Sequence, residues 1–108
     1  MSEKKKLIRA AFRSAVFSRD QHKCRVCGAA PPEVVLDAHH VTDRNDLPNG
    51  GYVVENGISV CGPCHEKAED YHRGLPPESL DPKFSAEELY RLIGSSYEKA
   101  LKASQKLG

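Results

Sequence analysis

Two Cys-x-x-Cys pairs constrain the fold of this chain more than any other feature. Cys24 and Cys27 form the first pair, and Cys61 and Cys64 form the second. A turn with this spacing presents two thiolates to one ion, and two such turns complete a tetrahedral zinc site. A redox-active pair or a disulfide is the alternative, but two matched pairs argue against a lone redox motif. The sequence therefore predicts one structural Zn²⁺ held by four cysteines.

The size and composition fit a small domain that needs such a metal. The chain has 108 residues, only 6% of which are aromatic, and no Trp. A chain this short forms one domain with a modest core. It has no apolar run long enough to span a membrane, and its basic start lacks the apolar segment of a secretory signal. We therefore expect a cytoplasmic, reducing compartment, in which cysteines bind metal rather than form disulfides.

Charge is unevenly distributed along the chain. Residues 1–27 carry eight basic and two acidic side chains, a formal charge of +6, whereas residues 28–108 carry eight basic and thirteen acidic ones. A basic N-terminal quarter can bind a polyanion such as nucleic acid while the remainder stays acidic. A solvated helix face is the alternative interpretation of the same residues.

The hydrophobic pattern predicts an order of helix, two strands, helix and long helix. Ser85 and Glu88 form a capping box that starts the last helix, and Gly94-Ser95-Ser96 is expected to weaken or kink it. The expected elements are a helix over 5–18, a strand over 34–41, short extended segments over 52–54 and 58–60 around an Asn56-Gly57 turn, a helix over 65–73, and a last helix of about 20 residues.

Three histidines accompany the cysteines. His39 and His40 are neighbours on the predicted strand, and His65 directly follows the last cysteine. Neighbouring strand residues point to opposite faces, so one of the pair can ligate a metal while the other faces a substrate. His22 and His72 are interpreted by default as surface or packed residues.

The joint order of these residues resembles the HNH endonuclease family in its zinc-stapled form. The resemblance covers about residues 12–72, including the lead-in Arg19-Asp20-Gln21-His22-Lys23-Cys24. It rests on Asp37-Ala38-His39-His40-Val41, on Asn56, and on Cys61-Gly62-Pro63-Cys64-His65. It implies a small α+β fold with a ββα-metal (His-Me finger) core, in which a two-stranded hairpin packs on a helix with one divalent ion between them. Residues 1–108 would then be a single HNH nuclease domain, with a basic N-terminal helix (1–20), a zinc and ββα-metal core (21–74) and a C-terminal helical extension (75–108).

The resemblance also implies roles for individual residues. His40 would be the general base that deprotonates the attacking water, and His39 and His65 would be ligands of the catalytic ion. Asn56 would hold the loop between the strands. Glu69 occupies a position where some relatives add a further histidine, and it is either a ligand or a solvated acid. His72 could touch phosphate or metal, and Asp37 could orient the ring of His39 from the same strand face.

These roles imply a metal-dependent endonuclease that hydrolyses phosphodiester bonds in DNA, with double-stranded DNA as the expected substrate. Mg²⁺ or Mn²⁺ is the expected catalytic ion, while imidazole ligands also suit Ni²⁺, Co²⁺ or Zn²⁺. The alternative is a non-catalytic, zinc-stabilised module that binds nucleic acid or protein, although such a module has no use for the three histidines and Asn56 together. The last helix could recruit a larger DNA-processing assembly or pair with a second copy.

Overall fold

A short β-hairpin lies at the centre of the molecule and carries the predicted residues. The computed structural model describes residues 3–107. Strands β1 (Leu36–His40) and β2 (Gly57–Cys61) pair antiparallel, with Leu36 opposite Cys61 and His40 opposite Gly57. Helix α2 (Gly62–Glu69) follows β2 directly and packs on the hairpin. The predicted α+β class with a ββα core is confirmed.

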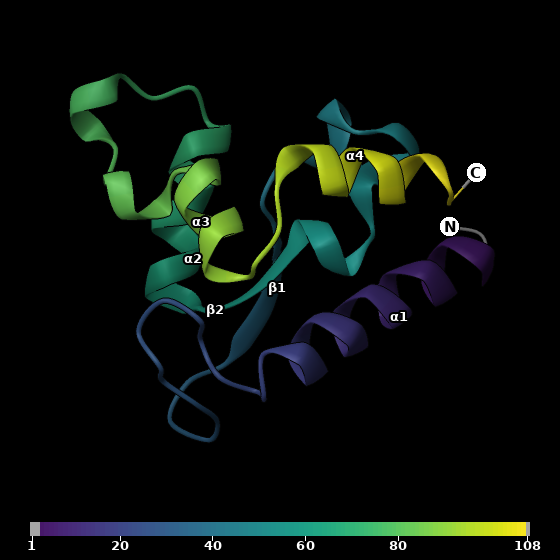
Figure 1. The fold of residues 1–108 in the computed structure, drawn as a ribbon. Coiled ribbons are helices and arrows are strands. Elements are labelled where there is room, and N and C mark those ends of the chain that lie inside the picture. Colours follow the sequence, from purple (N-terminus) through teal and green to yellow (C-terminus); the bar gives the residue numbers. More distant parts are fainter. Residues whose placement is uncertain (1–2, 108) are drawn as a thin grey trace.

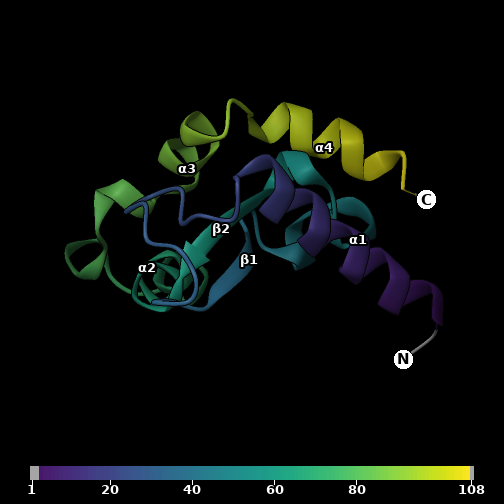
Figure 2. The same cartoon turned by 90° about the horizontal axis from the view of Figure 1, so that it is seen from below.

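Helices flank the hairpin, as predicted. In Figure 1, α1 (Glu3–Arg19) runs along one side of the hairpin, and α4 (Tyr97–Gln105) lies on the other side. Figure 2 shows α3 (Ala86–Leu92) and α4 following each other across the top of the molecule. All five residues of β2 are buried because elements pack on both of its faces. None of the helices in the described part of the chain is long and apolar enough to cross a membrane.

Helix α1 approaches the hairpin so closely that only glycine fits at the start of β2. A Cβ atom on Gly57 would lie 2.3 Å from Val16 Cγ2 and 2.8 Å from the Phe12 ring. Val16 is fully buried and Phe12 nearly so, whereas Leu7 on the same helix is exposed. Phe12 and Val16, four residues apart on one face of the helix, therefore cover the start of β2.

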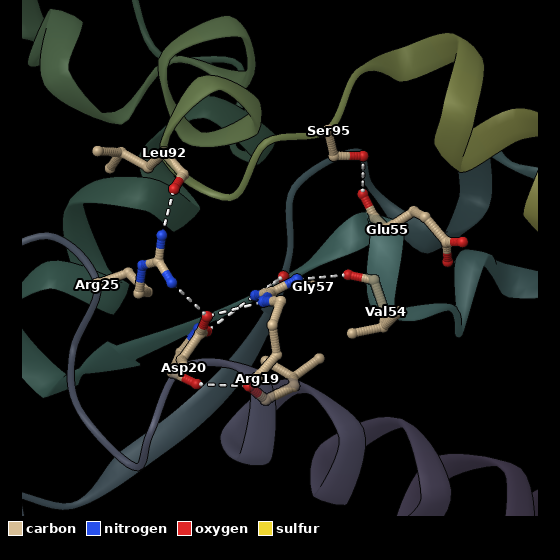
Figure 3. Close-up of polar contacts among 10 residues, drawn as sticks. Arg19, Asp20, Arg25, Val54, Glu55, Gly57, Leu92 and Ser95 are labelled. Carbon is tan, nitrogen blue, oxygen red and sulfur yellow. Dashed lines mark hydrogen bonds and ion pairs between the residues drawn. The ribbon is translucent and has the colours of Figure 1, made fainter.

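A buried ion network fixes the end of α1 to the hairpin and to the C-terminal segment (Figure 3). The Asp20 side chain has no exposed surface and accepts hydrogen bonds from Arg19, from Arg25 and from the backbone N–H of Ser59. Arg19 also donates to the carbonyl oxygens of Val54 and Gly57, at 2.7 and 2.6 Å. A buried carboxylate is stable only when it is paired in this way, so the network defines how these segments meet.

The same network reaches the C-terminal extension. The Arg25 guanidinium donates to the carbonyl oxygen of Leu92, at the end of α3. The Ser95 hydroxyl donates to the carbonyl oxygen of Glu55 at 2.8 Å. In the segment that joins β1 to β2, the Asn49 amide donates to the carbonyl oxygen of Ser104 at 2.8 Å. Helices α3 and α4 therefore pack on the core rather than extend from it.

The prediction of one continuous last helix is wrong. The chain forms two helices, because Gly94 adopts a left-handed conformation with φ of 66° and ends the first of them. Ser85 caps α3 as predicted, since its hydroxyl accepts from the Glu88 N–H at 3.2 Å. Ser96 caps α4 in the same manner through the N–H of Lys99, at 3.1 Å. The glycine therefore introduces a complete break and not a kink.

The other element boundaries also differ from those predicted. Helix α2 begins at Gly62 and ends at Glu69, earlier than the predicted 65–73, because Pro63 suits the first turn of a helix. Residues 52–54 do not form a strand, and Asn56-Gly57 is not a turn between two strands. The long segment 41–56 joins β1 to β2 instead, and it contains short 3₁₀ turns at 44–46, 48–51 and 54–56.

Candidate metal and active site

The four cysteines of the two pairs come together at one point. Their sulfur atoms lie within 4.8 Å of one another, and Cys27 Sγ is 3.7 Å from Cys61 Sγ. Four sulfurs bound to zinc at about 2.3 Å would be separated by about 3.8 Å in tetrahedral geometry. The spacing fits a zinc ion, and four thiolates would leave no open position on it.

Local structure favours the thiolate form of Cys24 but not that of Cys64. Burial acts to raise the pKa of Cys24, but backbone hydrogen bonds with Cys27, Cys61 and Val26 outweigh it and lower the pKa to about 7. Burial and the neighbouring sulfurs raise the pKa of Cys64 instead. Thiolates this close together repel one another, so a bound dication is what would allow all four to be deprotonated.

A second group of metal-type donors lies where β1 faces α2. His39 projects from β1, and His65 and Glu69 lie one turn apart on the same face of α2. Their donor atoms also lie within 4.8 Å of one another. Glu69 Oε1 is 3.2 Å from His39 Nδ1 and 3.2 Å from His65 Nε2. The hairpin and helix therefore bring together two histidines predicted from the sequence and one carboxylate.

This donor set fits a divalent cation. Adjacent ligands of an octahedral ion bound at about 2.1 Å are separated by about 3 Å, close to the observed spacing. Two imidazoles and a carboxylate suit several divalent transition metals, and the oxygen donor also admits Mg²⁺. Burial, followed by repulsion from the neighbouring histidines, lowers the pKa of His39 to about 3, so its ring is a neutral donor near pH 7. Asp37 Oδ2 lies 3.5 Å from His65 Nδ1 and can orient that ring. Asp37 was expected to orient the ring of His39, whereas the imidazole with which it forms a contact is that of His65.

His40 lies on the opposite face of β1 from His39, as the strand period predicted. Its ring stacks on Phe12 with centroids 4.6 Å apart and meets the edge of Tyr52 at 4.7 Å. Burial and the nearby Arg44 cation lower the pKa of His40 to about 4, so the ring is neutral near pH 7. Its Nε2 is buried and has no hydrogen-bond partner among the described residues. His39 Nε2 is in the same state, and a bound water, ion or substrate group would satisfy such an atom.

His72 supports the two neighbouring histidines instead of joining the donor group. Its Nε2 lies 2.9 Å from the carbonyl oxygen of His40, and its ring stacks on that of His39 with centroids 5.1 Å apart. His22 lies elsewhere, with its ring 6.3 Å from that of Phe17. His22 is therefore packed away from the donor group, whereas His72 lies next to it.

The two sides of β1 meet at one open hollow of about 400 Å³. His39, His65 and Glu69 line it together with His40 and His72. Asp43, Arg44 and Asn45 contribute the rim from the segment after β1. A neutral imidazole, three metal-type donors and an arginine therefore surround one space that solvent can enter.

Asn56 closes the long loop between the strands. Its side chain is fully buried, accepts from the Thr42 N–H at 2.9 Å, and donates to the carbonyl oxygens of Thr42 and Gly51 at 3.0 and 3.2 Å. The Tyr90 hydroxyl donates to Asn56 Oδ1 at 2.8 Å and lies 2.6 Å from Thr42 Oγ1. Helix α3 thus supports the end of β1 that carries His39 and His40.

Sequence reasoning did not find all of these residues. Phe12, Tyr52 and Tyr90 were absent from the predicted site because each lies in an element with no motif of its own. Glu69 was found, but only as one of two alternatives. Its spacing of four residues from His65 was the available signal, since it places both on one helix face.

Comparison with known proteins identifies the class to which this arrangement belongs. Residues 24–70 match the family model described as HNH endonuclease. The matched segment begins at the first cysteine of the four-cysteine cluster and includes the hairpin and all of α2. The match identifies residues 24–70 as an HNH endonuclease domain, with a four-cysteine cluster in its ββα core. Searches of curated proteins and of solved structures each gave no match.

Proposed function

We propose that this HNH domain is a metal-dependent endonuclease that hydrolyses phosphodiester bonds in double-stranded DNA. The observation that carries the proposal is one hollow that joins the neutral ring of His40 to the donors of His39, His65 and Glu69. Hydrolysis of a phosphodiester needs an activated water and a positive charge on the phosphate and leaving oxygen. These two groups of residues would supply both requirements.

His40 is the proposed general base. Its unpartnered ring nitrogen accepts a proton from a water as the water oxygen bonds to phosphorus. The bond from phosphorus to the 3′ oxygen then breaks, and that oxygen takes a proton from solvent. A ring that is neutral before the reaction can perform this step near neutral pH.

His39, His65 and Glu69 would hold the catalytic ion, with Mg²⁺ or Mn²⁺ as the expected occupant. When bound, the ion supplies charge stabilisation for the phosphate and the leaving oxygen. Three protein donors leave positions for phosphate and water. Asn56 would keep the loop 41–56 closed so that His40 stays beside these donors.

The four cysteines would hold a structural zinc. This role differs from that of the histidine group, because a four-thiolate shell excludes substrate. Residues 1–108 would act as one domain, which is supported by the bonds that join α1, α3 and α4 to the core.

Plasmid nicking by the zinc-loaded protein tests the proposal. Supercoiled DNA should be converted to open-circular or linear DNA only when Mg²⁺ or Mn²⁺ is added. His40→Ala should lower the rate by at least about a hundredfold, since a positioned general base contributes about 10²–10⁴. His22→Ala is the matched control and should cleave as the wild type does. Near wild-type cleavage by folded, zinc-loaded His40→Ala would remove His40 as the base.

The alternative is a non-catalytic, zinc-stabilised module that binds nucleic acid or protein. It would use the cysteines and leave the histidine group without a role. Wild-type protein that binds DNA yet fails to cleave it with any of the divalent ions Mg²⁺, Mn²⁺, Ni²⁺, Co²⁺ or Zn²⁺ would favour this alternative.

A further inference from the structure

A second hollow of about 730 Å³ lies beside the one that holds the histidines. It runs between the start of α1 and the segment 44–52, and the end of the described chain at Leu107 closes it. Its cationic lining side chains are Lys4, Lys5, Arg9 and Arg44, and no lining residue in the described part of the chain is acidic. We call this hollow the basic groove.

The basic groove is continuous with the site that holds His40. Arg44 and Asn45 line both hollows. Tyr52 connects them on the inside, since it lines the basic groove while its ring meets the edge of the His40 ring at 4.7 Å. A chain-like ligand in the histidine site can therefore continue into the groove.

Two arginines in the groove differ from the other described arginines in their lack of a carboxylate partner. Within residues 3–107, neither Arg9 nor Arg44 forms an ion pair with a carboxylate. The remaining arginines each have an acidic partner within 4.0 Å: Arg13 with Asp37, Arg19 and Arg25 with Asp20, Arg73 with Asp70, and Arg91 with Glu88. The groove is therefore where the protein leaves guanidinium groups available to an external anion.

Tyr52 places these two guanidinium groups. The Arg9 guanidinium carbon lies 5.7 Å from the centre of the Tyr52 ring, and Arg44 Nη1 donates to the Tyr52 hydroxyl at 3.4 Å. Cation–π and hydrogen-bond contacts with an uncharged side chain order an arginine without neutralising it. A guanidinium held in this way can bind a phosphate through two parallel hydrogen bonds.

We propose that the basic groove binds the phosphodiester backbone of one nucleic-acid strand next to the bond that is cleaved. Arg9 and Arg44 contact successive phosphates, and Lys4 and Lys5 extend the path along α1. This inference rests on the proposed nuclease function, because the strand is that of the substrate. Its contacts are to phosphate only, so the groove contributes affinity without sequence preference.

Binding of a fluorescent 24-base-pair duplex, measured by anisotropy at several salt concentrations without added divalent metal, tests the proposal. Arg9→Gln/Arg44→Gln should weaken binding by at least about tenfold for every duplex sequence. It should also reduce the slope of log affinity against log salt by about two, since each phosphate contact contributes about 0.9. Arg9→Lys/Arg44→Lys should retain the slope, because charge is kept, while losing affinity.

Arg91→Gln is the matched control, since Arg91 lies on α3 and lines neither the basic groove nor the histidine site. Melting temperature and zinc content should equal those of the wild type in every variant compared. A folded Arg9→Gln/Arg44→Gln protein with wild-type affinity and slope would overturn the groove proposal even if the enzyme cleaves DNA. A reduced slope in a protein that never cleaves DNA would support the groove and overturn the nuclease function.

Discussion

The four-cysteine cluster and the His39-His65-Glu69 group lie on the same hairpin and helix but differ in how they meet solvent. Three of the four cysteines are buried, and four sulfurs would complete the shell of a zinc ion. The histidine group offers three donors, and it opens into a hollow lined by further polar residues. A closed donor set suits a structural ion and an open one suits catalysis, so one small α+β unit can combine both kinds of site.

Position along the chain explains how both sites can share α2. Cys64 lies in the first turn of the helix and belongs to the four-cysteine cluster, whereas His65 and Glu69 face β1. The four-cysteine cluster joins the first turn of α2 to the loop after α1. It therefore fixes the helix that presents two of the three donors of the other site.

Loss of the closed site should have the largest effect. Cys61→Ser is expected to unfold or aggregate the protein, because zinc contributes about 10–16 kcal/mol in small zinc domains, which equals or exceeds a typical domain stability of about 5–15 kcal/mol. Far-UV circular dichroism and zinc analysis of the purified variant measure this effect. A cooperatively folded variant without zinc would show that the cluster is dispensable.

Loss of one donor from the open site should affect metal dependence and leave the fold intact. Glu69→Gln removes the carboxylate that meets both histidines and should raise the Mn²⁺ concentration for half-maximal nicking by at least about tenfold, since even partners of metal ligands are worth about 10–100-fold in affinity. Glu66→Gln, an exposed residue on the same helix, is the control. Equal metal dependence in the two variants would exclude Glu69 as a ligand.

A smaller effect is expected where α3 supports the open site. Tyr90→Phe removes the hydroxyl that donates to Asn56 and should lower the free energy of unfolding by about 1 kcal/mol. It should also slow nicking severalfold at saturating DNA, because the end of β1 is held less firmly. Tyr97→Phe, at an exposed position of α4, should change stability by less than about 0.5 kcal/mol. Chemical denaturation and single-turnover nicking measure the two effects, and equal results for both variants would show that Tyr90 supports neither.

The parts of the molecule that could be predicted are those with a local signal. The cysteine spacing predicted the cluster, and the alternation of strand side chains placed His39 and His40 on opposite faces. The apolar stripe of α1 predicted a helix. Each of these follows from a few neighbouring residues.

The features that could not be predicted depend on contacts between segments that are distant in the sequence. Tyr90 reaches Asn56 across 34 positions, and nothing in the sequence around either residue indicates this pairing. Phe12 acquires its place beside His40 only when α1 packs on the hairpin. The break at Gly94 was predicted too weakly because a glycine within a helical pattern is often tolerated, and here its left-handed φ ends the helix.

The difference between the two sites can be measured directly on one preparation. Zinc-loaded protein is passed over a weak chelating resin, and its metal content, melting temperature and plasmid nicking are then determined before and after Mn²⁺ is added. The account predicts one zinc per chain, no nicking before the addition, and nicking afterwards with little change in melting temperature. Full nicking with zinc in the four-cysteine cluster as the only metal, or loss of the fold when only the second ion is removed, would contradict the assignment of one closed structural site and one open catalytic site.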